Sequence, residues 1–85
     1  MIKRRVELKL SEGATEMLRK LPFEDQKRLY GVILSLRTDP FPARAEKIPM
    51  SESYRITVGA FRILYEMEGT TVRVEAIRSI LAGLI

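Results

Sequence analysis

The chain of 85 residues contains no cysteine and no histidine. Without cysteine it can form neither a disulfide framework nor a thiolate metal site, and this fits a reducing compartment. Without histidine it lacks the commonest imidazole base and the commonest zinc ligand. Any chemistry must therefore use lysine, arginine, tyrosine, serine, threonine or carboxylate side chains.

Long apolar runs are also absent. No run approaches the roughly 20 residues that are needed to span a bilayer, and the opening MIKRRVELKL lacks the continuous apolar core of a signal peptide. We therefore expect a soluble, cytoplasmic protein with no membrane partner. The length leaves room for one domain, residues 1–85, near the small end of what an apolar core can stabilise.

The charge balance is moderately basic, with fifteen Lys and Arg residues against eleven Asp and Glu residues and a net charge of +4. Such a balance favours an anionic partner, either nucleic acid or an acidic protein segment, although many small soluble domains share it. Residues 1–10 hold four basic side chains against one glutamate. This local patch fits a solvated strand flank as well as it fits phosphate contact.

The first half of the chain predicts one strand and two helices. Apolar and charged residues alternate over residues 3–10, which is typical of a strand. Ser11 can cap a first helix, and Pro22 ends that helix and suits the first turn of a second one. Two helices joined so tightly should form an antiparallel hairpin. The predicted inward residues are Ala14, Met17, Leu18 and Leu21, then Phe23, Gln26, Leu29 or Tyr30, Ile33 and Leu36.

The second half predicts a loop and three strands. Residues 37–53 contain three prolines and no periodicity, which indicates a loop that leads back to the sheet. The alternation in YRITVGAFRILYEM then predicts two strands joined by Gly59-Ala60 as a type II′ turn. The pairs on one face of this hairpin are Val58 with Phe61, Ile56 with Ile63, and Tyr54 with Tyr65.

A second turn at Glu68-Gly69 extends this buried face to a third strand. The resulting pairs are Tyr65 with Val72, Ile63 with Val74, and Phe61 with Ala76. The two helices should cover the face that these pairs form. The sequence therefore predicts an α+β fold in the order β-α-α-β-β-β, with a helical hairpin packed on one face of a mostly antiparallel four-stranded sheet.

The other face of the predicted sheet carries basic side chains. In this register Arg62 lies opposite Thr57 and Glu75, and Arg55 lies diagonally from Arg62. A guanidinium fork binds phosphate bidentately and keeps its charge, so two of them on a rigid sheet could hold an RNA backbone. The alternative is an exposed ion pair between Arg62 and Glu75 that contributes little, and geometry alone favours it.

The order of the elements and the segment YRITVGAFRILYEMEGTTVRV resemble the RelE/ParE superfamily of bacterial and archaeal toxins. Members show a Tyr-Arg/Lys-Ile strand, a glycine turn and an aromatic-Arg-Ile/Leu-hydrophobic-Tyr strand. Residues 54–65 match this pattern in order, and LRKLP (18–22) and AEKI (45–48) also match family positions. The resemblance covers nearly all of the chain.

The resemblance implies a toxin of a type II toxin–antitoxin system, with a cognate antitoxin as its partner. RelE-like members enter the ribosomal A site and cut mRNA by attack of a ribose 2′-hydroxyl on the adjacent phosphate, with no metal and no small-molecule cofactor. By this resemblance Arg62 takes the catalytic position of the aromatic-Arg strand and Arg55 takes a second basic position. The predicted RNA contacts are Lys47, Arg73, Arg78 and Thr57, the last of which stands where the family has another cation.

The end of the chain departs from the family pattern. Many members close with a basic segment and a Tyr or His that helps in proton transfer, whereas this chain ends in IRSILAGLI, where Arg78 alone is basic. Tyr54 and Tyr65 belong to the predicted buried face, which leaves Glu66 as the one carboxylate near Arg62 that could act as a base.

The apolar tail and the missing terminal residues leave three functions open. Leu81 and Leu84 should pack onto the domain or into a partner, because a free terminus does not need so many apolar residues. The first function is a ribosome-dependent mRNA endoribonuclease. The second is a ParE-like inhibitor of a protein such as DNA gyrase, and the third is a structural relative that binds antitoxin or RNA without turnover.

Overall fold

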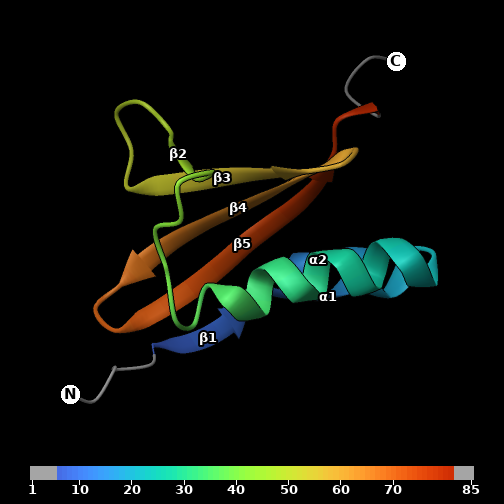
Figure 1. Ribbon diagram of the computed structural model, residues 1–85, viewed down its shortest axis with the longest axis horizontal. Coiled ribbons are helices and arrows are strands. Elements are labelled where there is room, and N and C mark those ends of the chain that lie inside the picture. Colours follow the sequence, from blue (N-terminus) through green and yellow to red (C-terminus); the bar gives the residue numbers. More distant parts are fainter. Residues whose placement is uncertain (1–5, 82–85) are drawn as a thin grey trace.

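The computed structural model describes residues 6–81, which form a twisted sheet with two helices packed on it (Figure 1). The elements are β1 (Glu7–Leu10), α1 (Glu12–Lys20), α2 (Phe23–Ser35), β2 (Glu46–Lys47), β3 (Ser53–Val58), β4 (Phe61–Glu68) and β5 (Thr71–Ser79). The strand order is β1-β5-β4-β3-β2, and β1 runs parallel to β5 while the other neighbours are antiparallel.

The α+β class and the element order are confirmed, and the strand number is corrected. Within residues 6–81 the sheet is mixed and has five strands, because Glu46–Lys47 in the expected loop pairs with β3. Two residues carry too little alternation to be recognised as a strand. Of the predicted first strand, residues 3–5 lie outside the described part of the chain.

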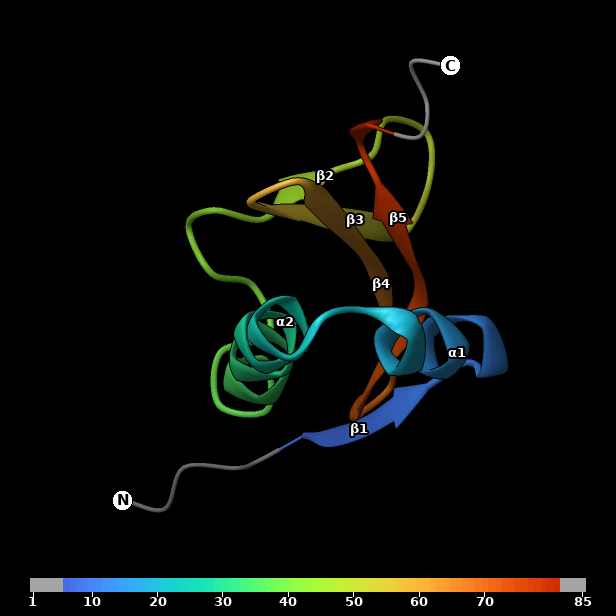
Figure 2. The ribbon, with the colours of Figure 1, turned by 90° about the vertical axis from the view of Figure 1, so that its right-hand side faces the viewer.

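The two helices begin and end close to the predicted positions. The Ser11 hydroxyl oxygen accepts a hydrogen bond from the Ala14 amide at 3.0 Å, so Ser11 is the N-cap of α1. Pro22 separates the helices and stands at the N-cap position of α2. Gln26 Nε2 donates to the Leu18 carbonyl oxygen at 2.7 Å, which ties α2 to α1 where they lie side by side (Figure 2).

The inward face of α2 is narrower than predicted. Leu29, Ile33 and Leu36 are fully buried, as expected. Phe23 and Tyr30 were predicted to face inward, but they are 70% and 42% exposed. Successive helical residues are rotated by about 100°, so a helix that buries Leu29 turns the side chain of Tyr30 away from the core, and Phe23 is the first residue of the helix.

The first hairpin has the predicted register. Val58 pairs with Phe61, Ile56 with Ile63, and Tyr54 with Tyr65. Gly59 has φ of 60° and Ala60 has no positive φ, which matches a turn with glycine at its first central position. The central strands supply Ile56, Ile63 and Tyr65 to the core, together with Ala14 and Leu18 of α1 and Leu29 and Ile33 of α2.

The second hairpin differs from the prediction by its turn and by a β-bulge. Its central residues are Gly69 and Thr70, because β4 and β5 pair Glu68 with Thr71. Gly69 has φ of 59°, so it takes the first central position, as Gly59 does in the first turn, and not the predicted second position. The pairing starts one residue later than predicted and then shifts again between Leu64 and Tyr65.

The bulge changes which residues of β5 face the core. Tyr65 pairs with Val74, but Leu64 pairs with Ala76, so Glu75 is the extra residue of β5. The predicted pairs of Tyr65 with Val72, Ile63 with Val74 and Phe61 with Ala76 are wrong, the first because of the later turn and the other two because of the turn and the bulge together. The inward position that was predicted for Ala76 belongs to Ile77, which is buried opposite Ile63.

The last described residues follow β5 and lie beside the turn that joins β3 to β4. The Ile80 amide donates to the Ala60 carbonyl oxygen at 2.8 Å. Leu81 is 62% exposed, so it does not pack onto the domain, and the other alternative, that it packs into a partner, stays a prediction. Leu84, the other predicted tail contact, lies outside the described residues. Within residues 6–81, neither helix has the length and apolar character needed to cross a membrane.

Candidate nucleic-acid interface

Two arginines lie directly opposite each other on the open face of the sheet, the face that is not covered by the helices. Arg62 on β4 is the direct cross-strand partner of Arg78 on β5, and Thr57 on β3 lies on its other side. All three side chains are exposed. The prediction that Arg62 faces Glu75 is wrong, because the later turn and the bulge together bring Arg78 to this position.

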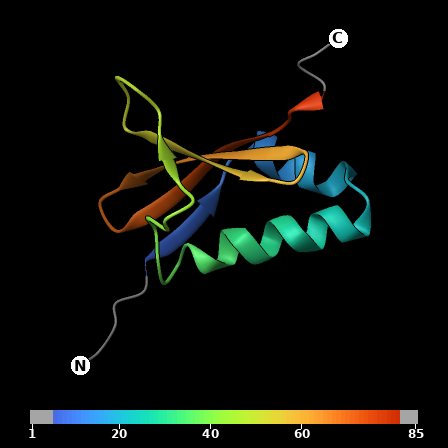
Figure 3. The ribbon, with the colours of Figure 1, turned by 45° about the horizontal axis from the view of Figure 1, so that its top comes forward.

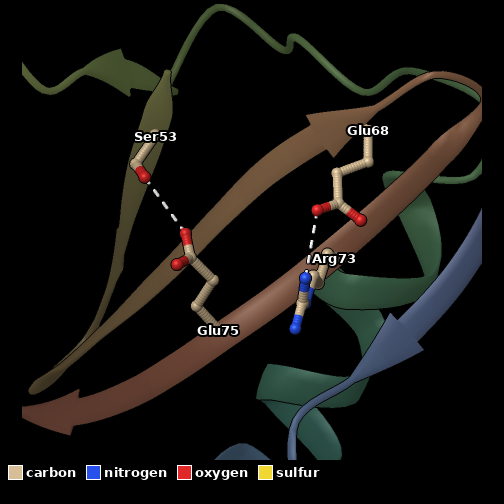
Figure 4. Close-up of polar contacts among 4 residues, drawn as sticks. All are labelled: Ser53, Glu68, Arg73 and Glu75. Atoms are coloured by element: carbon tan, nitrogen blue, oxygen red, sulfur yellow. Dashed lines mark hydrogen bonds and ion pairs between the residues drawn. The ribbon is translucent and has the colours of Figure 1, made fainter. Parts of the chain in front are cut away.

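Glu75 makes a different contact, across the sheet. Its Oε1 accepts a hydrogen bond from the Ser53 hydroxyl at 3.0 Å, so it spans β4 from β5 to β3 (Figure 4). Ser53 lies at the start of β3 and Thr57, the neighbour of Arg62, lies near its end. The bulge residue therefore does not neutralise the arginine pair, and the alternative of an Arg62–Glu75 ion pair is excluded.

The charges of Arg62 and Arg78 are not balanced within the described chain. Like charges directly opposite each other on neighbouring strands are destabilising. Among residues 6–81, neither guanidinium forms an ion pair with a carboxylate. Two exposed guanidinium groups in this arrangement can each bind a phosphate oxygen pair bidentately, and a bound polyanion would remove their mutual repulsion.

Two further arginines lie near the same end of the sheet, and the sequence did not identify them. Arg44 Nη2 donates to the Thr57 carbonyl oxygen at 3.0 Å. Arg28 Nη1 on α2 lies 3.2 Å from the position that a Cβ atom at Gly59 would take. Arg44 comes from an irregular loop and Arg28 from a helix, so no strand alternation relates them to Arg62.

The remaining predicted site residues lie elsewhere. Arg55 is diagonal to Arg62 in the register, as predicted, but its Nε binds Glu46 Oε1 of β2 at 3.3 Å. Lys47 lies on β2 beside this pair. Arg73 binds Glu68 through Nη1 and Oε2 at 3.0 Å near the second turn (Figure 4). The predicted set thus separates into three places, and only Thr57, Arg62 and Arg78 come together.

The candidate proton-transfer groups are not beside this pair. Tyr65 is fully buried and its hydroxyl donates to the Pro40 carbonyl oxygen at 2.7 Å. Burial and the nearby Tyr54 raise the pKa of Tyr65 to about 12. Glu66 pairs with Ser53 and Arg73 in the sheet, about 13 Å along β4 from Arg62. The expectation that the strand tyrosines cannot act at this face is confirmed, and the nomination of Glu66 as a nearby base is wrong.

Residues 6–81 contain no group of three or more Asp or Glu side chains arranged to hold a metal ion. The arrangement that these residues do offer is a cationic end of the sheet: Arg62 and Arg78 lie on the open face, Arg44 bonds to the edge of β3, and Arg28 reaches the Gly59 turn from α2.

Several solved structures have a similar fold. No protein-family model and no curated protein matches the chain. The archaeal RelE-RelB complex from Pyrococcus horikoshii matches with a TM-score of 0.78 and 17% identity over 93% of this chain and 97% of that chain. The intact E. coli RelBE toxin-antitoxin complex matches with a TM-score of 0.76 and 19% identity over 87% and 95%.

A ParE-type structure is equally similar. The chromosomal ParDE TA system from P. aeruginosa matches with a TM-score of 0.78 and 10% identity over 89% of this chain and 97% of that chain. Because the identities are low, these matches establish the fold and not the activity. The chain thus has the fold of the RelE and ParE toxins, as the sequence resemblance predicts.

Proposed function

We propose that this protein is the toxin of a type II toxin–antitoxin system and acts as a RelE-like, ribosome-dependent mRNA endoribonuclease. The fold, which it shares with toxins from RelBE and ParDE systems, supports the toxin assignment. The observation that carries the RNA assignment is the cross-strand pair of Arg62 and Arg78, two exposed cations without a carboxylate partner among residues 6–81.

The proposed chemistry is attack of a ribose 2′-hydroxyl on the adjacent phosphate of the mRNA. The bond from phosphorus to the 2′-oxygen forms as the bond to the 5′-oxygen breaks, and negative charge grows on the non-bridging oxygens. Arg62 and Arg78 would hold the phosphate and stabilise this charge, and positioning together with electrostatics can supply much of such catalysis. The 2′-hydroxyl proton would pass to solvent or to the ribosome, and the leaving 5′-oxygen would take a proton from the same sources, because Tyr65 and Glu66 lie away from the pair.

The proposed partners are a cognate antitoxin, the ribosome and mRNA. The solved relatives include RelE bound to RelB, which supports an antitoxin for this chain. Arg28 and Arg44 would extend the cationic surface beyond the reacting phosphate, where further nucleotides or ribosomal RNA would lie.

The second candidate is binding without cleavage, either as a ParE-like inhibitor of DNA gyrase or as an RNA-binding relative. It is favoured by one observation, the displacement of Tyr65 and Glu66 from the arginine pair. The equal similarity to a ParDE structure is consistent with it.

The deciding experiment maps mRNA ends by primer extension on translating ribosomes with purified full-length protein. We expect cleavage that depends on ribosomes and is lost in Arg62→Ala and in Arg78→Ala. Arg19→Ala is the matched control, because Arg19 is an exposed arginine of α1 that forms an ion pair with Glu16. Cleavage that survives both site substitutions would refute the site.

A gyrase assay separates the two candidate functions. Inhibition of DNA supercoiling by the purified protein, without mRNA cleavage, would establish the ParE-like function and refute the endoribonuclease. Binding of mRNA on ribosomes that is lost in Arg62→Ala, but without new mRNA ends, would identify an RNA-binding protein that does not turn over.

A further inference from the structure

The solvent-facing side of α2 carries a stripe of large apolar side chains. Phe23, Tyr30 and Leu34 are 70%, 42% and 51% exposed. They are separated by seven and four residues, a spacing that aligns them along one side of a helix. Lys27 lies in the same stripe, with its Nζ 5.9 Å from the centre of the Phe23 ring. Figure 3 shows that α2 runs along the outside of the molecule, so the stripe has no cover within the described chain.

A glycine beside this stripe has no role in the fold of the single chain. Gly31 is exposed in the middle of α2, and a Cβ atom added there would meet nothing within 4 Å. It does not have the positive φ that would require glycine. Glycine weakens the interior of an exposed helix relative to alanine. A residue without a side chain at this position is instead suited to the close approach of another surface.

We propose that α2 pairs in antiparallel fashion with α2 of a second copy of this chain. A two-fold axis between Tyr30 and Gly31 places each Tyr30 ring over the partner's Gly31. The same axis places the aliphatic stem of Lys27 against the partner's Leu34. The interface is then self-complementary, as a two-fold interface has to be, and both the apolar stripe and the exposed glycine are used.

The charges support this orientation. Glu24 and Arg37 are both exposed, and neither forms an ion pair among residues 6–81. With the axis between residues 30 and 31, Glu24 in the first turn of α2 lies at the level of the partner's Arg37, just after the C-terminal end of that helix, so their long side chains can form two ion pairs between the protomers. A parallel pair in register would instead place Glu24 on Glu24 and Lys27 on Lys27, and like charges disfavour it.

The expected dimer is weak and reversible. α2 has 13 residues and is therefore about 20 Å long, so one helix pair buries less than a standard interface. The dimer does not use the Arg62–Arg78 pair, because these residues lie on the exposed side of strands whose other side packs on the helices. The inference therefore holds or fails independently of the proposed nuclease function.

Sedimentation equilibrium of the purified full-length chain tests the proposal over a wide range of concentrations. We expect a monomer–dimer equilibrium that Leu34→Glu weakens by about tenfold or more. Met50→Glu is the matched control, because Met50 is a fully exposed apolar residue in a loop outside α2. Far-UV circular dichroism verifies that each variant is folded.

A charge exchange tests the antiparallel register. Glu24→Arg and Arg37→Glu should each weaken the dimer, and the double variant should restore it. A chain that stays monomeric at all concentrations overturns the proposal. So does a dimer that is unaffected by Leu34→Glu, or a double variant weaker than either single one. If Leu34→Glu instead abolishes antitoxin binding by a chain that never dimerises, the face belongs to the antitoxin and the proposal is wrong.

Discussion

Replacement of Tyr65 by phenylalanine tests how the core holds the loop between α2 and β2. The Tyr65 ring is fully buried and stacks on Tyr54, with 5.7 Å between ring centres. Its hydroxyl donates to the Pro40 carbonyl oxygen at 2.7 Å. Phenylalanine keeps the ring packing but removes this donor. The net contribution of such a hydrogen bond is about 0.5–1.5 kcal/mol, and a buried acceptor that stays unbonded raises the cost toward about 3 kcal/mol.

The same substitution changes how stability depends on pH. The pKa of Tyr65 is raised from 10.0 to about 12 in the folded chain, first by burial and then by the nearby Tyr54. Between these values the unfolded chain binds fewer protons than the folded one, so stability falls as the pH rises. The contribution is fully present below about pH 10 and is lost as the pH rises through about 12, with an upper limit of about 2.7 kcal/mol for two pKa units.

Urea unfolding followed by far-UV circular dichroism, from about pH 8 to about pH 11.5, measures both effects. At pH 8 Tyr65→Phe should be less stable than the wild type, and the difference should shrink as the pH rises, because phenylalanine has no proton to lose. Tyr30→Phe is the control, because Tyr30 is half-exposed on α2. If the stabilities of the wild type and Tyr65→Phe fall in parallel with pH, the assignment of a buried, hydrogen-bonded hydroxyl is refuted.

Four other substitutions have definite expected outcomes. Ile63→Ala should lower the free energy of unfolding in urea by roughly 2–5 kcal/mol, because Ile63 is a fully buried residue of β4 in the core that the sheet shares with both helices; a loss well below this range would contradict the core assignment. Gly59→Ala should destabilise by about 1–2 kcal/mol through its φ of 60°, and Arg28 Nη1 would crowd the new Cβ at 3.2 Å; unchanged stability would exclude the strained turn. Gly31→Ala should raise monomer stability by about 0.5–1 kcal/mol, since the added methyl group meets no atom; thermal unfolding at low concentration measures this, and a loss would point to an unseen contact. Arg62→Lys should give cleavage between the wild type and Arg62→Ala, because lysine keeps the charge and loses the bidentate fork; activity equal to the wild type would show that only charge matters.

Local patterns were sufficient for the first hairpin and for the start of α1. Alternation over residues 54–65 and one glycine at the turn determine both the register and the covered face, since a slip by one residue would expose every apolar side chain. Ser11 was recognisable as a cap because the capping contact reaches only to Ala14. The same alternation predicts that Arg62, the neighbour of the buried Ile63, points to the open face.

Other features depend on packing that a local pattern does not contain. Phe23 and Tyr30 have helical spacing relative to the core residues of α2, but only the side of the helix that carries Leu29 and Ile33 packs on the sheet. The pairing of Lys47 in β2 depends on β3, which follows it in the chain. Arg44 reaches the site through a hydrogen bond to the Thr57 carbonyl from a loop without periodicity.

The composition of the arginine pair depends on the bulge in β5, and the bulge is held by contacts distant in sequence. The Ser11 hydroxyl, which caps α1, also donates to the Glu75 carbonyl oxygen at 2.6 Å, across 64 positions of the chain. The Ser53 hydroxyl donates to the Glu75 side chain. These bonds satisfy groups of the one residue that the β4–β5 ladder omits. Without the extra residue, the observed turn would set Ile77 opposite Arg62; with it, Ile77 turns into the core and Arg78 lies opposite Arg62, so the bulge creates a pair of unbalanced cations on an open sheet face.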